Sequence, residues 1–298
     1  MTKRRKTGHL ITEQINPETG HIDECSTLRI IDLISEEDQG VADTVAEQKE
    51  NIAKAVDLIV DRLSAGGRLI FIGAGTSGRL GVMEAAECPP TFGTKPRLIR
   101  GIIAGGKKAL WRSVERTEDS RTESQRALSK LGLNNKDIVI GIAASGTTPF
   151  VEGALSYAKK RRSARVLITC NPVNSPLPNV TISLLVGPEA IVGSTRMKAG
   201  TATKMVLNML TTASMVRLGK TYGNLMVEVE PNSEKLRDRA KRIVMQILGV
   251  NRQKVERLLI KSNWYVKVAV IMGKKKMSYK TAKEHLEKHD GFLRAALK

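Results

Sequence analysis

Short runs of apolar residues, each followed by small polar residues, recur along the first two thirds of the chain. The run Leu69-Ile70-Phe71-Ile72 lies between Gly66-Gly67 and Gly73. An uninterrupted apolar run of this length is typical of a strand buried on both faces of a parallel sheet. Similar runs predict further strands at residues 98–104, 137–144, 166–169 and 182–186. Because helical stretches alternate with these runs, we expect a doubly wound α/β fold with a mainly parallel, five-stranded sheet.

Helical spacing of apolar residues predicts the elements on either side of the sheet. One long helix is expected from Ser35 to about Ser64, and a charged one from Lys107 to about Leu131. Pro231 is followed by Asn232 and Ser233, either of which can cap another helix. Three short helices are expected near the C-terminus, at about 251–261, 264–273 and 278–287.

The turn after the first predicted strand has the composition of an anion site. It contains the sequence GAGTSG, Gly73 to Gly78, and the stretch Arg79 to Glu87 follows as an expected helix. We expect Pro89-Pro90 to end that helix, because proline lacks the N–H that a helix interior needs. Backbone N–H groups at a glycine turn and a helix start bind phosphate, so the pattern predicts a phosphate site.

The same turn also matches the dinucleotide fingerprint GxGxxG, at Gly73, Gly75 and Gly78. That fingerprint is normally followed by an acidic residue about 20 positions later, which binds the ribose hydroxyl. No Asp or Glu occurs between Glu87 and Glu115. The pattern therefore favours a phosphorylated small molecule over a dinucleotide.

Two further turns of small polar residues follow predicted strands or precede a predicted helix. Ser145-Gly146-Thr147-Thr148-Pro149 follows the third strand, and Pro149 suits the first position of a helix. Gly193-Ser194-Thr195 precedes a long apolar helix. Ligands of doubly wound sheets bind at the carboxyl ends of strands, so we expect one shared site. The candidate substrate- and phosphate-binding residues are Gly75, Thr76, Ser77, Gly78, Arg79, Ser145, Gly146, Thr147, Thr148, Ser194, Thr195 and Lys198.

Composition limits the partners that the protein can be expected to bind and the cellular compartment in which it is expected. The 298 residues have a formal net charge of +19, and residues 251–298 contain 13 Lys or Arg against 4 Asp or Glu. With only 3% aromatic residues, we interpret the charge as solvated basic helix faces with non-specific polyanion affinity rather than specific nucleic-acid binding. No apolar run approaches the roughly 20 residues that span a membrane. Three widely spaced cysteines and the lack of a signal-peptide pattern favour the cytoplasm.

Several long motifs make the chain resemble the N-acetylmuramic acid 6-phosphate etherases. They are GAGTSGRLGVMEAAECPPTFGT, IIAGG, the VExxED segment (114–119), IAASGxTPFV, GPEAIVGSTRMKAGTATKMVLNML and VRLGKTYGNLMVEV, and ECPPTFGT is the most specific. The resemblance implies a three-layer α/β/α sugar isomerase (SIS) fold, a homodimer and no metal or redox cofactor. It also implies three parts, namely an N-terminal segment and helical arm (1–54), an SIS phosphosugar-binding domain (55–230) and a C-terminal helical region (231–298).

The resemblance further implies a reaction, which is the loss of D-lactate from N-acetylmuramic acid 6-phosphate during cell-wall recycling. It assigns Glu87 as the proton donor to the departing lactate and Glu118 as the base at C2. Two carboxylates suit this chemistry, because one removes a proton while the other protonates the leaving oxygen. The residues alone do not assign these roles, and they do not distinguish Glu118 from Glu115 or Asp119.

The chain departs from the family pattern at two positions near these motifs. Thr147 stands where the family usually has arginine, and Arg116 stands where it usually has glycine. Two alternatives use the same fold and phosphate site: an aldose–ketose phosphosugar isomerase and a non-catalytic regulator that senses a sugar phosphate. Only the etherase releases lactate, so product analysis separates the three.

Overall fold

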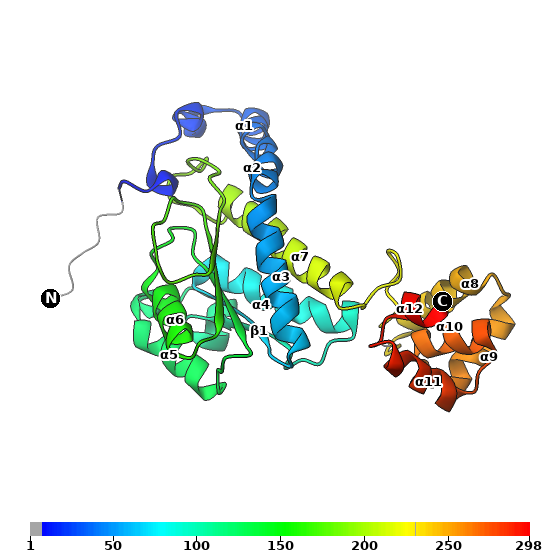
Figure 1. The fold of residues 1–298 in the computed structure, drawn as a ribbon. Helices are drawn as coiled ribbons and strands as arrows, with labels where there is room; N and C mark the ends of the chain where they lie inside the picture. The colour runs from blue at the N-terminus through cyan, green and yellow to red at the C-terminus, as the bar shows by residue number, and fades with distance from the viewer. Residues whose placement is uncertain (1–7, 230) are drawn as a thin grey trace. The chain divides into compact units, whose positions relative to one another are not determined.

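The computed structural model describes residues 8–229 and 231–298 (Figure 1). These residues form two compact units. The first contains the described chain up to Ala86 together with Arg97–Thr211, and the second contains Glu87–Pro96 and the described part of Thr212–Lys298. Four consecutive basic residues near the N-terminus, Lys3-Arg4-Arg5-Lys6, add to the net charge of the sequence and lie outside the described residues. None of the described helices is both long and apolar enough to cross a membrane.

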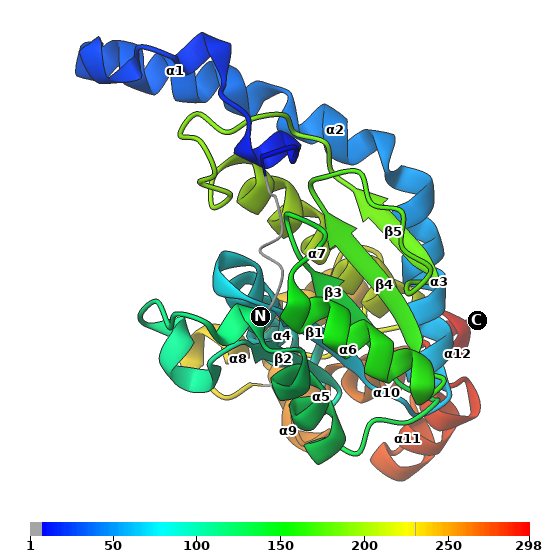
Figure 2. The same ribbon diagram turned by 90° about the vertical axis from the view of Figure 1, so that its left-hand side faces the viewer.

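A five-stranded, all-parallel sheet forms the centre of the first unit, which confirms the α/β prediction. Its order is β2-β1-β3-β4-β5 (Figure 2). The strands are β1 (Leu69–Gly73), β2 (Ile99–Ile103), β3 (Ile138–Ile142), β4 (Ala164–Thr169) and β5 (Val180–Ser183). Every residue of β1 and β3 is buried, as continuous apolar runs predict.

Helices cover both faces of the sheet, because strand side chains alternate between the faces. On one face, Ile70, Val139 and Leu167 pack in a core with residues of α5 (Arg121–Lys130) and α6 (Pro149–Lys160). Helices α3 (Lys49–Ser64) and α7 (Lys198–Arg217) lie on the opposite face (Figure 2). The three layers thus match the predicted arrangement.

The prediction of one long helix from Ser35 to about Ser64 is wrong. Three short 3₁₀ turns, η1 (Ile11–Glu13), η2 (Pro17–Thr19) and η3 (Ile22–Glu24), precede three separate helices, α1 (Thr27–Gln39), α2 (Val41–Glu47) and α3. The breaks fall at Gly40 and Gln48. Glycine has the highest backbone entropy cost in a helix, so the break at Gly40 has a direct physical cause.

Helix α4 also differs from its predicted bounds. It extends over Gly75–Phe92 and contains both Pro89 and Pro90, which we expected to terminate it. Proline's fixed φ suits a helix, although each of these prolines lacks the N–H that would donate to the carbonyl four residues earlier. The helical bonding continues past the prolines, since the Gly93 N–H donates to the Pro89 carbonyl at 2.9 Å.

The helix predicted over Lys107–Leu131 is replaced by three shorter pieces. These are the 3₁₀ turns η4 (Gly106–Leu110) and η5 (Thr117–Asp119), and then α5. Arg116 has a φ of 63°, in the left-handed region, which a right-handed helix excludes. Ser120 then caps α5, because its Oγ accepts a hydrogen bond from the Glu123 N–H at 3.2 Å.

The second unit is helical and has its own core. Its helices are α8 (Glu234–Leu248), α9 (Arg252–Lys261), α10 (Val266–Lys275), α11 (Tyr279–Lys288) and α12 (Leu293–Leu297). The three predicted helices and the Ser233 cap of α8 are confirmed, and α12 is an addition. Lys267 is buried in α10, and its Nζ donates to the Gly219 and Gly291 carbonyls at 2.9 and 2.7 Å. Burial lowers the pKa of Lys267, while its ion pair with Glu228 opposes that shift.

The burial of Cys170 yields a test of the core. Cys170 directly follows β4, and burial raises the pKa of its thiol to about 12. We expect Cys170 to resist iodoacetamide at pH 8 in the native protein, because only about 10⁻⁴ of it is thiolate and the sulfur is covered. Partly exposed Cys25 is the matched control and should be alkylated, as peptide mass spectrometry can measure. Equal labelling of the two thiols before unfolding would contradict this packing.

Candidate functional site

Three turns of small residues meet at one cavity of about 1080 Å³ in the first unit. The turns follow β1, follow β3 and precede α7, as the sequence pattern indicates. The segment 118–122 lies on the cavity wall as well. The predicted phosphate-binding residues that line the cavity are Gly75, Thr76, Ser77, Ser145, Thr147, Thr148 and Thr195.

The turn after β1 depends on a close approach of α4 to the end of the strand. A Cβ on Gly78 would lie 2.6 Å from the Gly73 carbonyl oxygen and 2.6 Å from Cγ1 of Ile103. Both distances are shorter than any real contact, so a larger residue would push the helix away from the strand. Gly78 does not itself line the cavity, and its role is to place Thr76 and Ser77 at the cavity wall.

The turn after β3 also needs a glycine and brings hydroxyl groups to the start of α6. Gly146 has a φ of 72°, and a Cβ there would lie 2.1 Å from Cγ2 of Val173. The Oγ of Ser145 accepts from the Thr147 N–H at 3.2 Å and lies 3.4 Å from the Oγ1 of Thr148. Pro149 is the first residue of α6, as predicted. Backbone N–H groups at a helix start attract anions, and these hydroxyls add further donors.

Some residues predicted to bind the substrate or its phosphate do not line this cavity, namely Gly78, Arg79, Gly146, Ser194 and Lys198. The Arg79 Nε donates to the Leu110 carbonyl at 3.4 Å. The Lys198 ammonium is buried and forms an ion pair with Glu37 of α1. The charge of Lys198 is thus paired within the protein, whereas the contact of Arg79 is with a backbone carbonyl.

The start of α7 is occupied by a carboxylate of the protein itself. Glu189 is fully buried, and its two oxygens accept from the N–H groups of Lys198 and Ala199 at 2.9 and 3.0 Å. Burial raises the pKa of Glu189, and these two hydrogen bonds act in the opposite direction. Sequence reasoning missed Glu189, because it lies nine residues before the helix that it caps.

The carboxylates predicted for catalysis lie in different units. Glu118 is exposed in η5 and lines the cavity together with Asp119, whereas Glu115 does not line it. The structure thus distinguishes Glu118 from Glu115, which the sequence did not. Glu87 is exposed on the part of α4 that belongs to the second unit.

A second acidic residue of α4, Glu84, is hydrogen-bonded to side chains of α7. Glu84 is buried, and its Oε2 accepts from Nδ2 of Asn208 at 2.9 Å. Its Oε1 accepts a hydrogen bond from the Thr211 hydroxyl. Both partners lie on α7, so this carboxylate joins α4 to α7 within the first unit.

Arg121 is a cavity residue that sequence reasoning missed. Among the described residues that line the cavity it is the one with a basic side chain. It is the first residue of α5 and forms an ion pair with Glu152 of α6. A cation at the positive end of a helix is locally unfavourable, but the sequence did not show this mismatch, because it predicted no helix start at residue 121.

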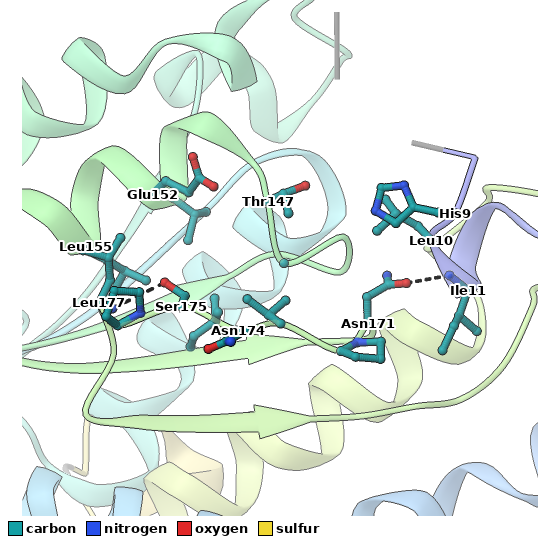
Figure 3. Close-up of a pocket in the computed structure, with 16 residues that line it drawn as sticks. His9, Leu10, Ile11, Thr147, Glu152, Leu155, Asn171, Asn174, Ser175 and Leu177 are labelled. Carbon is teal, nitrogen blue, oxygen red and sulfur yellow. Dashed lines mark hydrogen bonds between the residues drawn. The ribbon is translucent and has the colours of Figure 1, made fainter. Parts of the chain in front are cut away.

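A smaller cavity of about 410 Å³ lies on the other side of the β3–α6 turn (Figure 3). Thr147 lines both cavities, and Glu152 lines the smaller one. Figure 3 shows Thr147 and Glu152 on the side formed by the start of α6, opposite the segment 171–177. Asn171 supports this wall, since its Oδ1 accepts from the Ile11 N–H at 2.7 Å.

Comparisons with known proteins identify full-length relatives. The family model of the glucokinase regulatory protein N-terminal SIS domain matches residues 51–159. An N-acetylmuramic acid 6-phosphate etherase from Trichodesmium erythraeum is 48% identical over 300 residues, covering 100% of this chain and 98% of the relative. Another from Clostridium botulinum strain Okra is 49% identical over 291 residues, covering 97% and 96%. Among solved structures, a phosphoheptose isomerase from Neisseria gonorrhoeae matches with a TM-score of 0.47 and 15% identity, covering 62% of this chain and 97% of that one.

The left-handed conformation of Arg116 yields a stability test beside the cavity. Because glycine adopts this conformation without a steric cost, Arg116→Gly should raise the free energy of unfolding by about 1 kcal/mol. Arg112 is the matched control, since it is exposed in the same loop and does not have a positive φ. Arg112→Gly should lower stability by roughly 0.5–1 kcal/mol, because glycine adds freedom to the unfolded chain. Urea denaturation measures both changes, and a destabilised Arg116→Gly would refute the assigned backbone strain.

Proposed function

The chain belongs to the N-acetylmuramic acid 6-phosphate etherase family, and we propose which of its residues perform the reaction. It is a carbon–oxygen lyase that acts on N-acetylmuramic acid 6-phosphate. The observation that supports the residue assignment is the large cavity of the first unit. It combines an exposed carboxylate, Glu118, with two Ser/Thr turns that each lie beside a helix start.

We propose that the 6-phosphate binds to the turns after β1 and β3. The hydroxyls of Thr76, Ser77, Ser145 and Thr148 and the N–H groups at the starts of α4 and α6 are suitable donors. Gly75, Thr147 and Thr195 line the same cavity and complete the proposed site. Gly78 and Gly146 act by leaving room for the close neighbours described above, which a Cβ would meet.

The chemistry of the ether explains why a base is needed. An alkyl ether at C3 is a poor leaving group, but in the open-chain sugar the C2 proton is acidified by the C1 aldehyde. We propose that Glu118 removes this proton, that the C3–O bond breaks, and that Glu87 protonates the lactate oxygen. Water then adds at C3 of the unsaturated aldehyde, giving N-acetylglucosamine 6-phosphate and D-lactate. For Glu87 the support is its position in the AAECPP motif.

Isotope labels test this elimination. Reaction in H₂¹⁸O should place ¹⁸O at C3 of the sugar product and none in the lactate hydroxyl, because the bond broken joins C3 to oxygen. In D₂O the product should contain deuterium at C2. Glu118→Gln keeps the shape of the side chain but removes the base, so lactate release should fall by about 10²-fold or more and C2 exchange should stop.

Two comparisons make the isotope test decisive. Glu115→Gln is the matched control, because Glu115 is exposed in the same loop and does not line the cavity. It should leave lactate release within about twofold of the wild type. Glu87→Gln should slow lactate release while C2 exchange continues. Label in the lactate hydroxyl, or undiminished exchange in Glu118→Gln, would refute the assigned mechanism.

We further propose that the protein is a cytoplasmic homodimer. Exposed apolar side chains of the first unit support a subunit interface, namely Leu28 and Ile31 on α1, which are 70% and 58% exposed. Free cysteines support a reducing compartment. The division at residues 54 and 230 remains a proposal, with the SIS phosphosugar-binding part between an N-terminal arm and a C-terminal helical region.

Introducing charged side chains on α1 tests the proposed dimer interface. Leu28→Glu combined with Ile31→Glu should convert the dimer to a monomer, because burying two carboxylates in an apolar interface is strongly unfavourable. Sedimentation equilibrium measures the mass. Ile260→Glu on α9 is the control, since Ile260 is similarly exposed, at 60%, but lies in the second unit. A wild-type monomer, or an unchanged mass in the α1 variant, would show that α1 is not an interface.

A further inference from the structure

We propose that Arg121 binds the 6-phosphate of the substrate, in the role expected of an arginine at position 147. This inference rests on the proposed function, because it assigns the cation of that same phosphate site. Its basis is the charge of the cavity, the way α6 holds Arg121, and the use of the other candidate cations elsewhere.

The cavity has an excess of acidic side chains. Glu13, Glu118 and Asp119 line it, and among its described lining residues Arg121 is the single basic one. The substrate adds a phosphate and the carboxylate of its lactyl group, so it is itself strongly anionic. Anions that leave water need charge-assisted hydrogen bonds, and arginine supplies them in a geometry that matches phosphate oxygens. Without Arg121 the lining offers a phosphate only neutral donors.

Backbone packing fixes the position of Arg121 beside α6. A Cβ on Gly153 of α6 would lie 2.7 Å from the Cα and 2.5 Å from the carbonyl oxygen of Arg121. The first residue of α5 therefore lies directly against the first turns of α6. That helix begins immediately after Thr147 and Thr148, which are proposed to bind the phosphate.

The side chain of Arg121 is held next to the same turn. Its Nη2 forms an ion pair with Glu152, which lies three residues after Pro149. Glu152 and Thr147 lie on the same side of the smaller cavity (Figure 3), while Arg121 and Thr147 both line the larger one. A guanidinium has five N–H donors, so the pair with Glu152 orients the group and leaves donors for an anion.

The other basic residues expected at this site have different partners. Arg79 donates to a backbone carbonyl, and Lys198 is paired with Glu37. At position 147, where the sequence resemblance leads us to expect arginine, the chain has threonine. Arg121 lines the same cavity as Thr147, so the start of α5 can supply the positive charge that the start of α6 lacks.

Binding of separate parts of the substrate tests the assignment. N-acetylglucosamine 6-phosphate contains the phosphate without the lactyl group, and N-acetylmuramic acid contains the lactyl group without the phosphate. By calorimetry, Arg121→Gln should raise the Kd of the phosphorylated sugar by about tenfold or more and leave that of N-acetylmuramic acid unchanged. Ser145→Ala is a positive control for the phosphate site, and Arg126→Gln, exposed on the same helix, should bind as the wild type does.

If Arg121 supplies the charge that binds the phosphate, an arginine introduced at position 147 should replace it. Thr147→Arg in the Arg121→Gln background should recover most of the lost affinity for N-acetylglucosamine 6-phosphate, whereas Thr147→Gln should not. An unchanged Kd in Arg121→Gln overturns the proposal, and so does a loss confined to N-acetylmuramic acid, which would assign Arg121 to the lactyl carboxylate. Wild-type lactate release tests the proposed function separately, so the two failures are distinguishable.

Discussion

The parallel pairing of β1 with β3 is the constraint on which the site depends. Gly73 is in register with Ile142, so the two strands end at the same level of the sheet. Each is followed by a tight turn and a helix, which brings two helix starts and their hydroxyl groups to one cavity. The close contact of Gly78 with the Gly73 carbonyl keeps α4 against its strand. The register therefore places both turns, each proposed to bind the phosphate, on the wall of the same cavity.

The sequence predicted the sheet well because burial on both faces leaves a strong and local signal. The signal was clearest for β1 and β3, which are buried throughout, whereas the edge strands β2 and β5 are only partly buried. The predicted bounds of all five strands were within a few residues of those observed. The helices were harder, since their breaks depend on single backbone conformations. The left-handed φ of Arg116 splits the predicted helix after β2, and no side-chain pattern marks arginine as adopting that conformation.

The charged residues of the site were predicted less well, because their partners are distant in the chain. Lys198 lies beside a Ser/Thr turn and looked like a phosphate ligand, yet it is paired with Glu37, which is 161 positions away. A buried ammonium is stable only with a partner, so this pair fixes α1 to the start of α7. Arg121 and Glu152 form a contact over 31 positions, and they are close only because α5 packs on α6. Local spacing identifies a helix start, but it does not show which cation lines the cavity.

The acidic excess of the cavity helps to distinguish a catalyst from a sugar-phosphate sensor on the same fold. A protein that only binds an anion gains nothing from carboxylates beside it, since each one repels the ligand. Glu118 and Asp119 nevertheless stand on the cavity wall, on a segment that also places Arg121 there. An elimination needs a base close to an anionic substrate, so it must combine the repulsive group with a compensating cation. The short segment from Glu118 to Arg121 contains the residues that we propose for both roles, and Arg121 is paired with Glu152 of α6. The arrangement is therefore costly for binding alone and suitable for proton abstraction from a bound phosphosugar.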